Sequence, residues 1–287
     1  MGQLIAKRYP TNIAGRMADY TYVVCGTGAK GWACWGGKSG GKSLRSAVGS
    51  TRRADSIAEP DEKANIRCYA INGVCHQAAN RILFPAQATV RGARGYKISE
   101  AIYNTYGRFR GPRGACLAPF HQHANVNGDL PECAVARPHE PPAAAEMEAD
   151  PERRYLSQVL DVYERRLDLE SGNVREGDPQ SLPVELFMLM VHHLLGDAVR
   201  EQALAALLEI RAGEEEERVR IEGSFLGHDM TVGAFVQALN DLGDRFQDNV
   251  AKVLSLDDYA ALLGVLPGDH VWLVDPDIAR AAYPERD

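Results

Sequence analysis

The spacing of apolar residues changes from alternating to helical near residue 75. Over Ile66–Ala70, apolar and polar positions alternate, which predicts a short strand with one buried face. Asn72 and Gly73 then form a turn sequence. From Cys75 onward, apolar residues recur at helical spacing until Pro85, which stops a helix. The pattern therefore predicts a strand, a turn and a helix that begins at Cys75.

The rest of the first half is predicted to contain short strands and one further helix. Thr21–Cys25 is rich in β-branched and aromatic residues, and Trp32–Trp35 is expected to pair with it as a hairpin. Ala88–Val90 is a third expected strand. Ser99 is expected to cap a helix over Glu100–Tyr106.

The second half is predicted to be helical. Its helices are expected over Asp150–Leu169, Val184–Arg211 and Thr231–Leu254, with a short one that begins at Ser255 and ends at Gly264. The acidic run Glu214–Glu217 is expected to be exposed, and Val271–Val274 to be a small strand or an extended tail. Such a bundle is suited to docking, dimerisation or partner binding.

Composition places the chain among globular proteins. Its 287 residues are 45% apolar and 25% charged, which is ordinary for a folded domain. No apolar run approaches the ~18 residues that a membrane span needs. The N-terminal sequence has no signal-peptide core, so a cytoplasmic protein with reduced cysteines is expected. Membrane partners are not expected.

Charge divides the chain into two parts. Residues 1–142 carry 19 Lys and Arg against 9 Asp and Glu, whereas residues 143–287 carry 13 against 30. The proline-rich segment Pro138–Ala145 is a linker candidate between them. Two domains are therefore expected, a basic one over 1–140 and an acidic helical one over 141–287, which attract each other. The acidic total and the lack of a known module argue against nucleic-acid binding.

Cys75 is the candidate nucleophile. At a helix N-terminus, the free amide groups and the helix dipole stabilise an anion, so a thiol there has a lowered pKa. The same amides can hold the oxyanion of a tetrahedral intermediate. The alternative is a buried, inert cysteine that packs at the start of a helix. Polar neighbours around the helix favour the nucleophile.

Four stretches carry a resemblance to a known class of enzymes. They read Y-T-Y-V-V-C, W-A-C-W-G-G, I-N-G-V-C-H-Q-A-A-N-R and A-R-G-Y, and lie within about residues 15–110. Together they resemble a bacterial group similar to papain-like thiol hydrolases in circularly permuted order. In that order the strand that carries the catalytic histidine precedes the cysteine helix. This chain has Tyr20 where that histidine is expected.

The resemblance implies a fold, an activity and a set of site residues. The fold would be α+β, with a papain-like domain followed by an α-helical one. The activity would be a thiol hydrolase, protease-like, or an acyltransferase, acting on an amide, isopeptide or thioester bond of a peptide or acyl substrate without a cofactor. The expected catalytic residues are Cys75, Tyr20 and Asn80, and the expected substrate-binding residues are Asp19, His76, Gln77 and Arg94.

The general base is left open by the sequence. A tyrosine of ordinary pKa near 10 does not activate a thiol at pH 7. The candidates are Asp19, His76, His121 and His123, although His76 is adjacent to Cys75 and adjacent helical residues do not face each other. The rival hypothesis is a catalytically silent papain-like domain in an interaction protein, which binds a partner through its helical domain.

Motif spacing offers two further candidate sites, one for nucleotide and one for metal. Gly36–Ser43 formally matches the phosphate-binding G-x-x-x-x-G-K-[ST] loop, but such a loop needs a buried strand before it and a long helix after it. A flexible basic loop is the simpler interpretation. Cys116, His121, His123 and Cys133 are zinc-type donors whose spacing fits no closed site, so no metal site is predicted.

Overall fold

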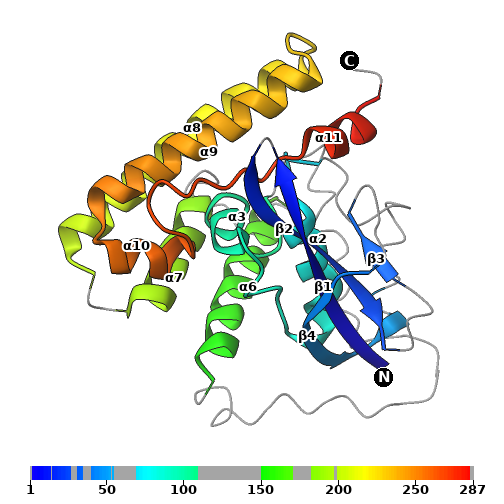
Figure 1. Cartoon of the computed structure of the whole chain (residues 1–287). Coiled ribbons are helices and arrows are strands. Elements are labelled where there is room, and N and C mark those ends of the chain that lie inside the picture. Colours follow the sequence, from blue (N-terminus) through cyan, green and yellow to red (C-terminus); the bar gives the residue numbers. More distant parts are fainter. Residues whose placement is uncertain are drawn as a thin grey trace.

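The protein has an α+β fold in which a four-stranded antiparallel sheet lies beside a layer of helices (Figure 1). The computed structural model describes residues 2–13, 15–26, 31–34, 40–52, 54, 69–108, 150–170, 182–196 and 199–284. The strands are β1 (Gly2–Ile13), β2 (Arg16–Cys25), β3 (Gly31–Ala33) and β4 (Lys42–Gly49), in the spatial order β3-β2-β1-β4.

The predicted hairpin of β2 and β3 is confirmed, and β2 is longer than the sequence pattern indicated. Val23 of β2 pairs with Trp32 of β3 in antiparallel register. Strand β1, which the sequence did not predict, pairs along the whole of β2, with Tyr9 opposite Tyr20. Pro10 is tolerated in β1 because the pairing with β4 ends at Arg8, so no partner on that side needs its missing N–H group.

Strand β4 occupies the end of the glycine-lysine-serine motif. Lys42 and Ser43 are the first residues of this strand and pair with Arg8 and Lys7 of β1. A phosphate-binding loop requires a helix at this point, whose N-terminal amides face the phosphates. The described part of the motif therefore lacks the context for nucleotide binding. Residues 36–39 of the motif lie outside the described residues.

The helix predicted from Cys75 is confirmed, whereas the elements after it differ from the expectation. Helix α2 spans Cys75–Leu83, and the 3-10 helix η2 (Phe84–Ala86) contains Pro85. Ala88–Val90 is buried but forms no strand. Helix α3 spans Tyr96–Tyr103 and begins after Gly95, which has a φ of 84° that favours glycine, so Ser99 lies inside the helix. The strand expected at 66–70 lies mostly outside the described residues.

The acidic half contains six described helices: α6 (Pro151–Glu170), α7 (Leu182–Leu195), α8 (Glu201–Leu226), α9 (Val232–Val253), α10 (Leu256–Leu263) and α11 (Pro276–Ala282). The predicted helix over 184–211 is in fact two helices: α7 ends at Leu195, before Gly196 with its φ of 69°, and α8 begins at Glu201. The helix starts predicted at Thr231 and Ser255 are confirmed, and each of these side chains caps its helix by accepting a hydrogen bond from the amide three residues later. Gly264 ends α10 in the left-handed region, as expected.

The acidic run on α8 is buried at Glu214 and Glu215, which contradicts the prediction of an exposed segment there, whereas Glu216 is exposed as expected and Glu217 is half-buried. Glu214 and Glu215 are 4% and 8% exposed, because they face three buried arginines. The buried ionic cluster consists of Arg108, Arg211, Arg218, Glu214, Glu215 and Glu222. Its six formal charges cancel, which is the condition for burying them.

The buried ionic cluster joins the two halves of the chain. Arg108 of the basic half contacts Glu215 at 2.5 Å and also pairs with Glu222. Arg211 of α8 donates to the carbonyl oxygens of Ala101 and Ile102 at the end of α3. Described residues from both halves also form one continuous hydrophobic cluster. The expected boundary near residue 140 lies outside the described residues.

The segment between α10 and α11 runs in extended form along α9 and ends beside the sheet (Figure 1). It forms no strand. Instead, the Asn240 side chain donates to the Val274 carbonyl at 2.9 Å and accepts from the Val274 amide at 3.1 Å. Gln247, two turns along α9, makes the same pair of bonds to Val271. Two side-chain amides thus take the place of a partner strand for the last part of this segment, Val271–Asp275, which is named the C-terminal strap.

Replacing Asn240 with alanine is expected to destabilise the protein by roughly 2–4 kcal/mol, because two buried backbone groups of Val274 lose their partners. Gln237→Ala is the matched control, since Gln237 is exposed and bonds only Asp241 on the same helix. Urea unfolding gives the free energies, and amide exchange at Val274 reports the strap directly. Equal stabilities of the two variants would show that the strap is held by other contacts.

Candidate functional site

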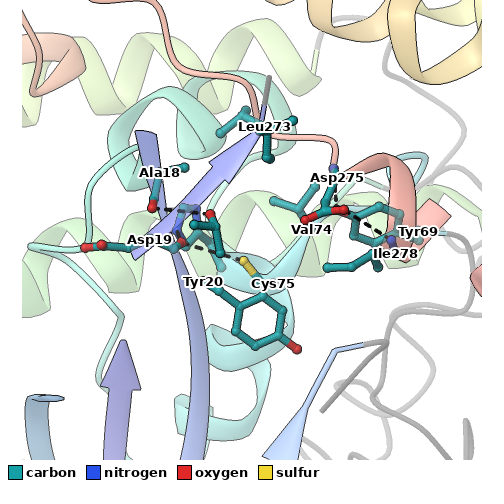
Figure 2. Close-up of a pocket in the computed structure, with 12 residues that line it drawn as sticks. Ala18, Asp19, Tyr20, Tyr69, Val74, Cys75, Leu273, Asp275 and Ile278 are labelled. Carbon is teal, nitrogen blue, oxygen red and sulfur yellow. Dashed lines mark hydrogen bonds between the residues drawn. The ribbon is translucent and has the colours of Figure 1, made fainter. Parts of the chain in front are cut away.

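Cys75 lines a small pocket to which three separate parts of the chain contribute (Figure 2). Strands β1 and β2 supply one wall, the start of α2 supplies the floor, and the C-terminal strap with α11 supplies the third side. The pocket is small, with a volume of about 20 Å³, which is room for about one water molecule, and it is partly open to solvent. Its lining includes the side chains of Asp19, Tyr20, Tyr69, Cys75, His76 and Asp275.

The Cys75 thiol is buried and held in its protonated form. Its Sγ lies 3.9 Å from the carbonyl oxygen of Asp19, an atom that can only accept a hydrogen bond. Burial raises the pKa of Cys75 to about 11, although hydrogen-bonding groups of Thr21 and the His76 amide offset part of the rise. Asp275 raises it further. The helix N-terminus is therefore insufficient to activate this thiol.

His76 is not positioned to act as a base for Cys75. Its Nε2 lies 2.9 Å from the Asp19 carbonyl oxygen and its Nδ1 lies 2.8 Å from the Ser99 hydroxyl. Nε2 must carry the proton, because a carbonyl oxygen cannot donate one. Burial lowers the pKa of His76 to about 4, so the ring is neutral at pH 7. It ties α2 to β2 and α3.

Tyr20 and Cys75 line the same pocket. Figure 2 shows the Tyr20 ring beside Cys75 with its hydroxyl directed away from the sulfur. That hydroxyl donates to the carbonyl oxygen of Cys34 at 3.1 Å. Burial and the nearby thiols raise the pKa of Tyr20 far above its usual range, so the phenol cannot accept a proton from Cys75 at neutral pH.

One oxygen of the Asp19 carboxylate is engaged with a basic group and a backbone amide. This oxygen, Oδ2, accepts from Arg8 Nη1 at 2.7 Å and from the Arg94 amide at 2.9 Å. Arg94 thus acts through its backbone, and its side chain is not among the groups that line the pocket. Neither residue is arranged to take up a proton from Cys75.

The polar residues that made the α2 motif distinctive hold a neighbouring loop. Gln77, Asn80 and Arg81 lie on one face of α2 and donate to three successive carbonyl oxygens, those of Asn104 at 3.0 Å, Thr105 at 2.7 Å and Tyr106 at 2.6 Å. None of these three side chains lines the pocket. The expected orienting role of Asn80 and the expected substrate contact of Gln77 are therefore replaced by a structural role.

Asp275 is the pocket residue that sequence reasoning missed. It caps α11, with Oδ1 accepting from the amides of Asp277 at 2.8 Å and Ile278 at 3.3 Å. Its own amide donates to the Tyr69 hydroxyl at 3.0 Å. The Asp-Pro sequence at 275–276 is a recognisable helix start. Nothing local indicates that this helix start lies beside Cys75, 200 residues earlier in the chain.

The zinc-type donors Cys116, His121, His123 and Cys133 lie outside the described residues. The two histidines among them are also candidate bases for Cys75. Within the ranges that the structure describes, no group of three or more His, Cys, Asp or Glu side chains is placed to hold a metal ion. None of the described helices combines the length and the apolar character needed to cross a membrane.

Comparisons with protein-family models, with curated proteins and with solved structures found no match to this chain. The pocket and the groups that line it are therefore the features that indicate a function.

Proposed function

We propose that this chain is a catalytically silent binding protein with a papain-like arrangement of its cysteine helix and preceding strand. The observation that carries the proposal is the state of Cys75, a buried thiol directed at a carbonyl oxygen. His76 is the one imidazole among the described residues that line the pocket, and both of its nitrogens have other partners. A nucleophilic thiol needs a base or a lowered pKa, and the described residues supply neither.

The helical half supports a binding role in a specific way. Its strap and α11 form one side of the pocket, and its helix α8 anchors it to the basic half through the buried ionic cluster. A ligand in the pocket would therefore contact both halves at once. In this proposal, the helical half completes the binding site and offers its outer surface to a protein partner.

The second candidate is the thiol hydrolase or acyltransferase that uses Cys75. It is supported by the position of Cys75 as the first residue of α2, where first-turn amides can hold an oxyanion, and by the pocket that this residue lines. It requires a base from outside the described residues, for which His121 and His123 are the sequence candidates. The pH dependence of Cys75 alkylation separates the two proposals.

Alkylation of Cys75 by iodoacetamide is expected to rise about tenfold per pH unit from pH 7 to pH 10, since the pKa of the thiol is about 11. The rate is followed by mass spectrometry of the Cys75 peptide, with the half-buried Cys25 as a reference thiol in the same chain. A rate that is already level below pH 8 would contradict the silent-protein proposal and favour the hydrolase. Cys75→Ala shows which signal belongs to this residue.

A further inference from the structure

The charge of the Cys75 pocket at neutral pH is set by one side chain. The thiol of Cys75 and the ring of His76 are neutral there, for the reasons of burial given above. The Tyr20 and Tyr69 phenols are also neutral, because burial raises the pKa of both. Asp19 forms an ion pair with Arg8 at 2.7 Å, so its carboxylate is compensated by a neighbouring cation. Asp275 is the remaining acidic group of the pocket lining.

The carboxylate of Asp275 is stabilised by amide dipoles and not by a cation. Asp275 Oδ1 accepts hydrogen bonds from the two amides at the start of α11. No lysine or arginine in the described ranges forms an ion pair with this carboxylate. The nearest described arginine of α11, Arg280, pairs with Asp277 instead. The negative charge of Asp275 also raises the pKa of Cys75, Tyr20 and Tyr69, so its field reaches across the pocket.

The other walls of the pocket are aromatic and aliphatic. Tyr20 and Tyr69 offer ring surfaces, and the Tyr20 ring also stacks on Tyr9 with centroids 5.1 Å apart. Aliphatic side chains of Ile13, Val74, Leu273 and Ile278 line the rest. Aromatic faces attract cations, and aliphatic walls accept the methylene chain that carries one. A carboxylate or phosphate ligand would instead meet the uncompensated charge of Asp275.

The structure assigns to this pocket a ligand of defined chemistry, an aliphatic primary ammonium ion whose charged end pairs with Asp275 and whose chain lies against the apolar walls. The assignment deepens the proposed binding function and rests on it. Small alkylamines and the lysine side chain share this chemistry. The pocket has room for one small group and is partly open, so either source would place only its ammonium end inside and extend its chain past the apolar walls toward the open side.

The assignment is tested with the full chain and n-butylammonium as the probe, titrated by calorimetry and by amide chemical shifts. n-Butanol has the same chain without charge, and butyrate has the opposite charge. We expect saturable binding of n-butylammonium, with shifts that map to Cys75, Tyr20 and the strap, and at least tenfold weaker binding of the other two. Nα-acetyl-lysine amide is the second arm, and its relative affinity distinguishes a lysine side chain from a small amine.

Asp275→Asn removes the charge and leaves the helix start intact, because asparagine caps helices as well as aspartate does. The affinity for n-butylammonium is expected to fall at least tenfold in this variant. Asp277→Asn is the matched control: it removes one acidic charge two residues away on the same helix, from an exposed side chain paired with Arg280. That variant should bind the probe as the parent chain does.

Occupancy of the pocket has a second readout in the same molecule. Bound n-butylammonium should slow alkylation of Cys75 and leave that of Cys25 unchanged. The assignment is overturned if the parent chain does not bind the probe saturably, if butyrate binds as well, or if Asp275→Asn and Asp277→Asn behave alike. These outcomes leave the silent-protein proposal standing, since that proposal fails only if the Cys75 thiol proves activated.

Discussion

Tyr20→His is expected to increase the rate of Cys75 alkylation at pH 7 by on the order of 100-fold. The reason is the shared pocket, in which an imidazole at position 20 would lie beside the thiol. A thiolate–imidazolium pair offsets the desolvation that raises the pKa of Cys75 to about 11. More thiolate speeds the reaction, although a thiolate of lower pKa is intrinsically less nucleophilic, which reduces the gain.

Two control variants separate a base effect from a loosened pocket. Tyr20→Phe removes the hydroxyl that binds the Cys34 carbonyl but supplies no base, so it should leave the pH profile unchanged. Tyr22→His places the same ring on the same strand, at a position that does not line the pocket. If Tyr20→Phe accelerates alkylation as much as Tyr20→His, the effect is one of access. If Tyr20→His does not change the rate, the side chain at position 20 does not interact with Cys75 as proposed.

Arg211→Ala is expected to destabilise the protein by about 3–5 kcal/mol, the range for breaking a buried ion pair from one side. The change leaves Glu214 and Glu215 without the guanidinium that lies 2.9 and 3.1 Å away. It also leaves the carbonyl oxygens of Ala101 and Ile102 without their donor. The free energy of unfolding in urea measures the loss.

Arg220→Ala is the matched control, because Arg220 lies on the same helix and pairs with Glu217 at the surface, where ion pairs contribute little. Arg211→Lys keeps the charge but loses the forked geometry, so it should lie between the parent and Arg211→Ala. This ordering keeps the test informative if the alanine variant does not fold. A loss in Arg211→Ala no larger than in Arg220→Ala would contradict the stabilising role of the buried ionic cluster.

The buried ionic cluster also changes the expectation about how the two halves attract each other. The sequence predicted attraction through exposed opposite charges, which salt screens. Arg108, Glu215 and Glu222 meet inside the protein, where screening is weak, and Arg108 lowers the pKa of Glu215 to about 2 against the opposing effect of burial. The surface pairs Arg45–Glu152 and Arg16–Asp244 add a contribution that salt would reduce.

The sequence by itself determined the elements whose signals are local. β-branched and aromatic residues specified the hairpin of β2 and β3, because the strand preference of such residues is visible within a few positions. Helix starts at Cys75, Thr231 and Ser255 follow from a change of period or from a capping side chain, and the end at Gly264 follows from the freedom of glycine at positive φ. These signals act over one or two turns.

Only the tertiary structure decided which groups meet. The run at 214–217 looks solvated in isolation, yet Glu214 and Glu215 are buried because three arginines, one of them more than 100 residues earlier, neutralise them. Gln77 and Asn80 look catalytic beside a cysteine, yet they satisfy the carbonyls of a loop that folds over α2. The pKa of Cys75 depends on burial by the rest of the chain, which outweighs the local helix dipole. Asp275 reaches the same pocket because Asn240 and Gln247 hold the strap in place.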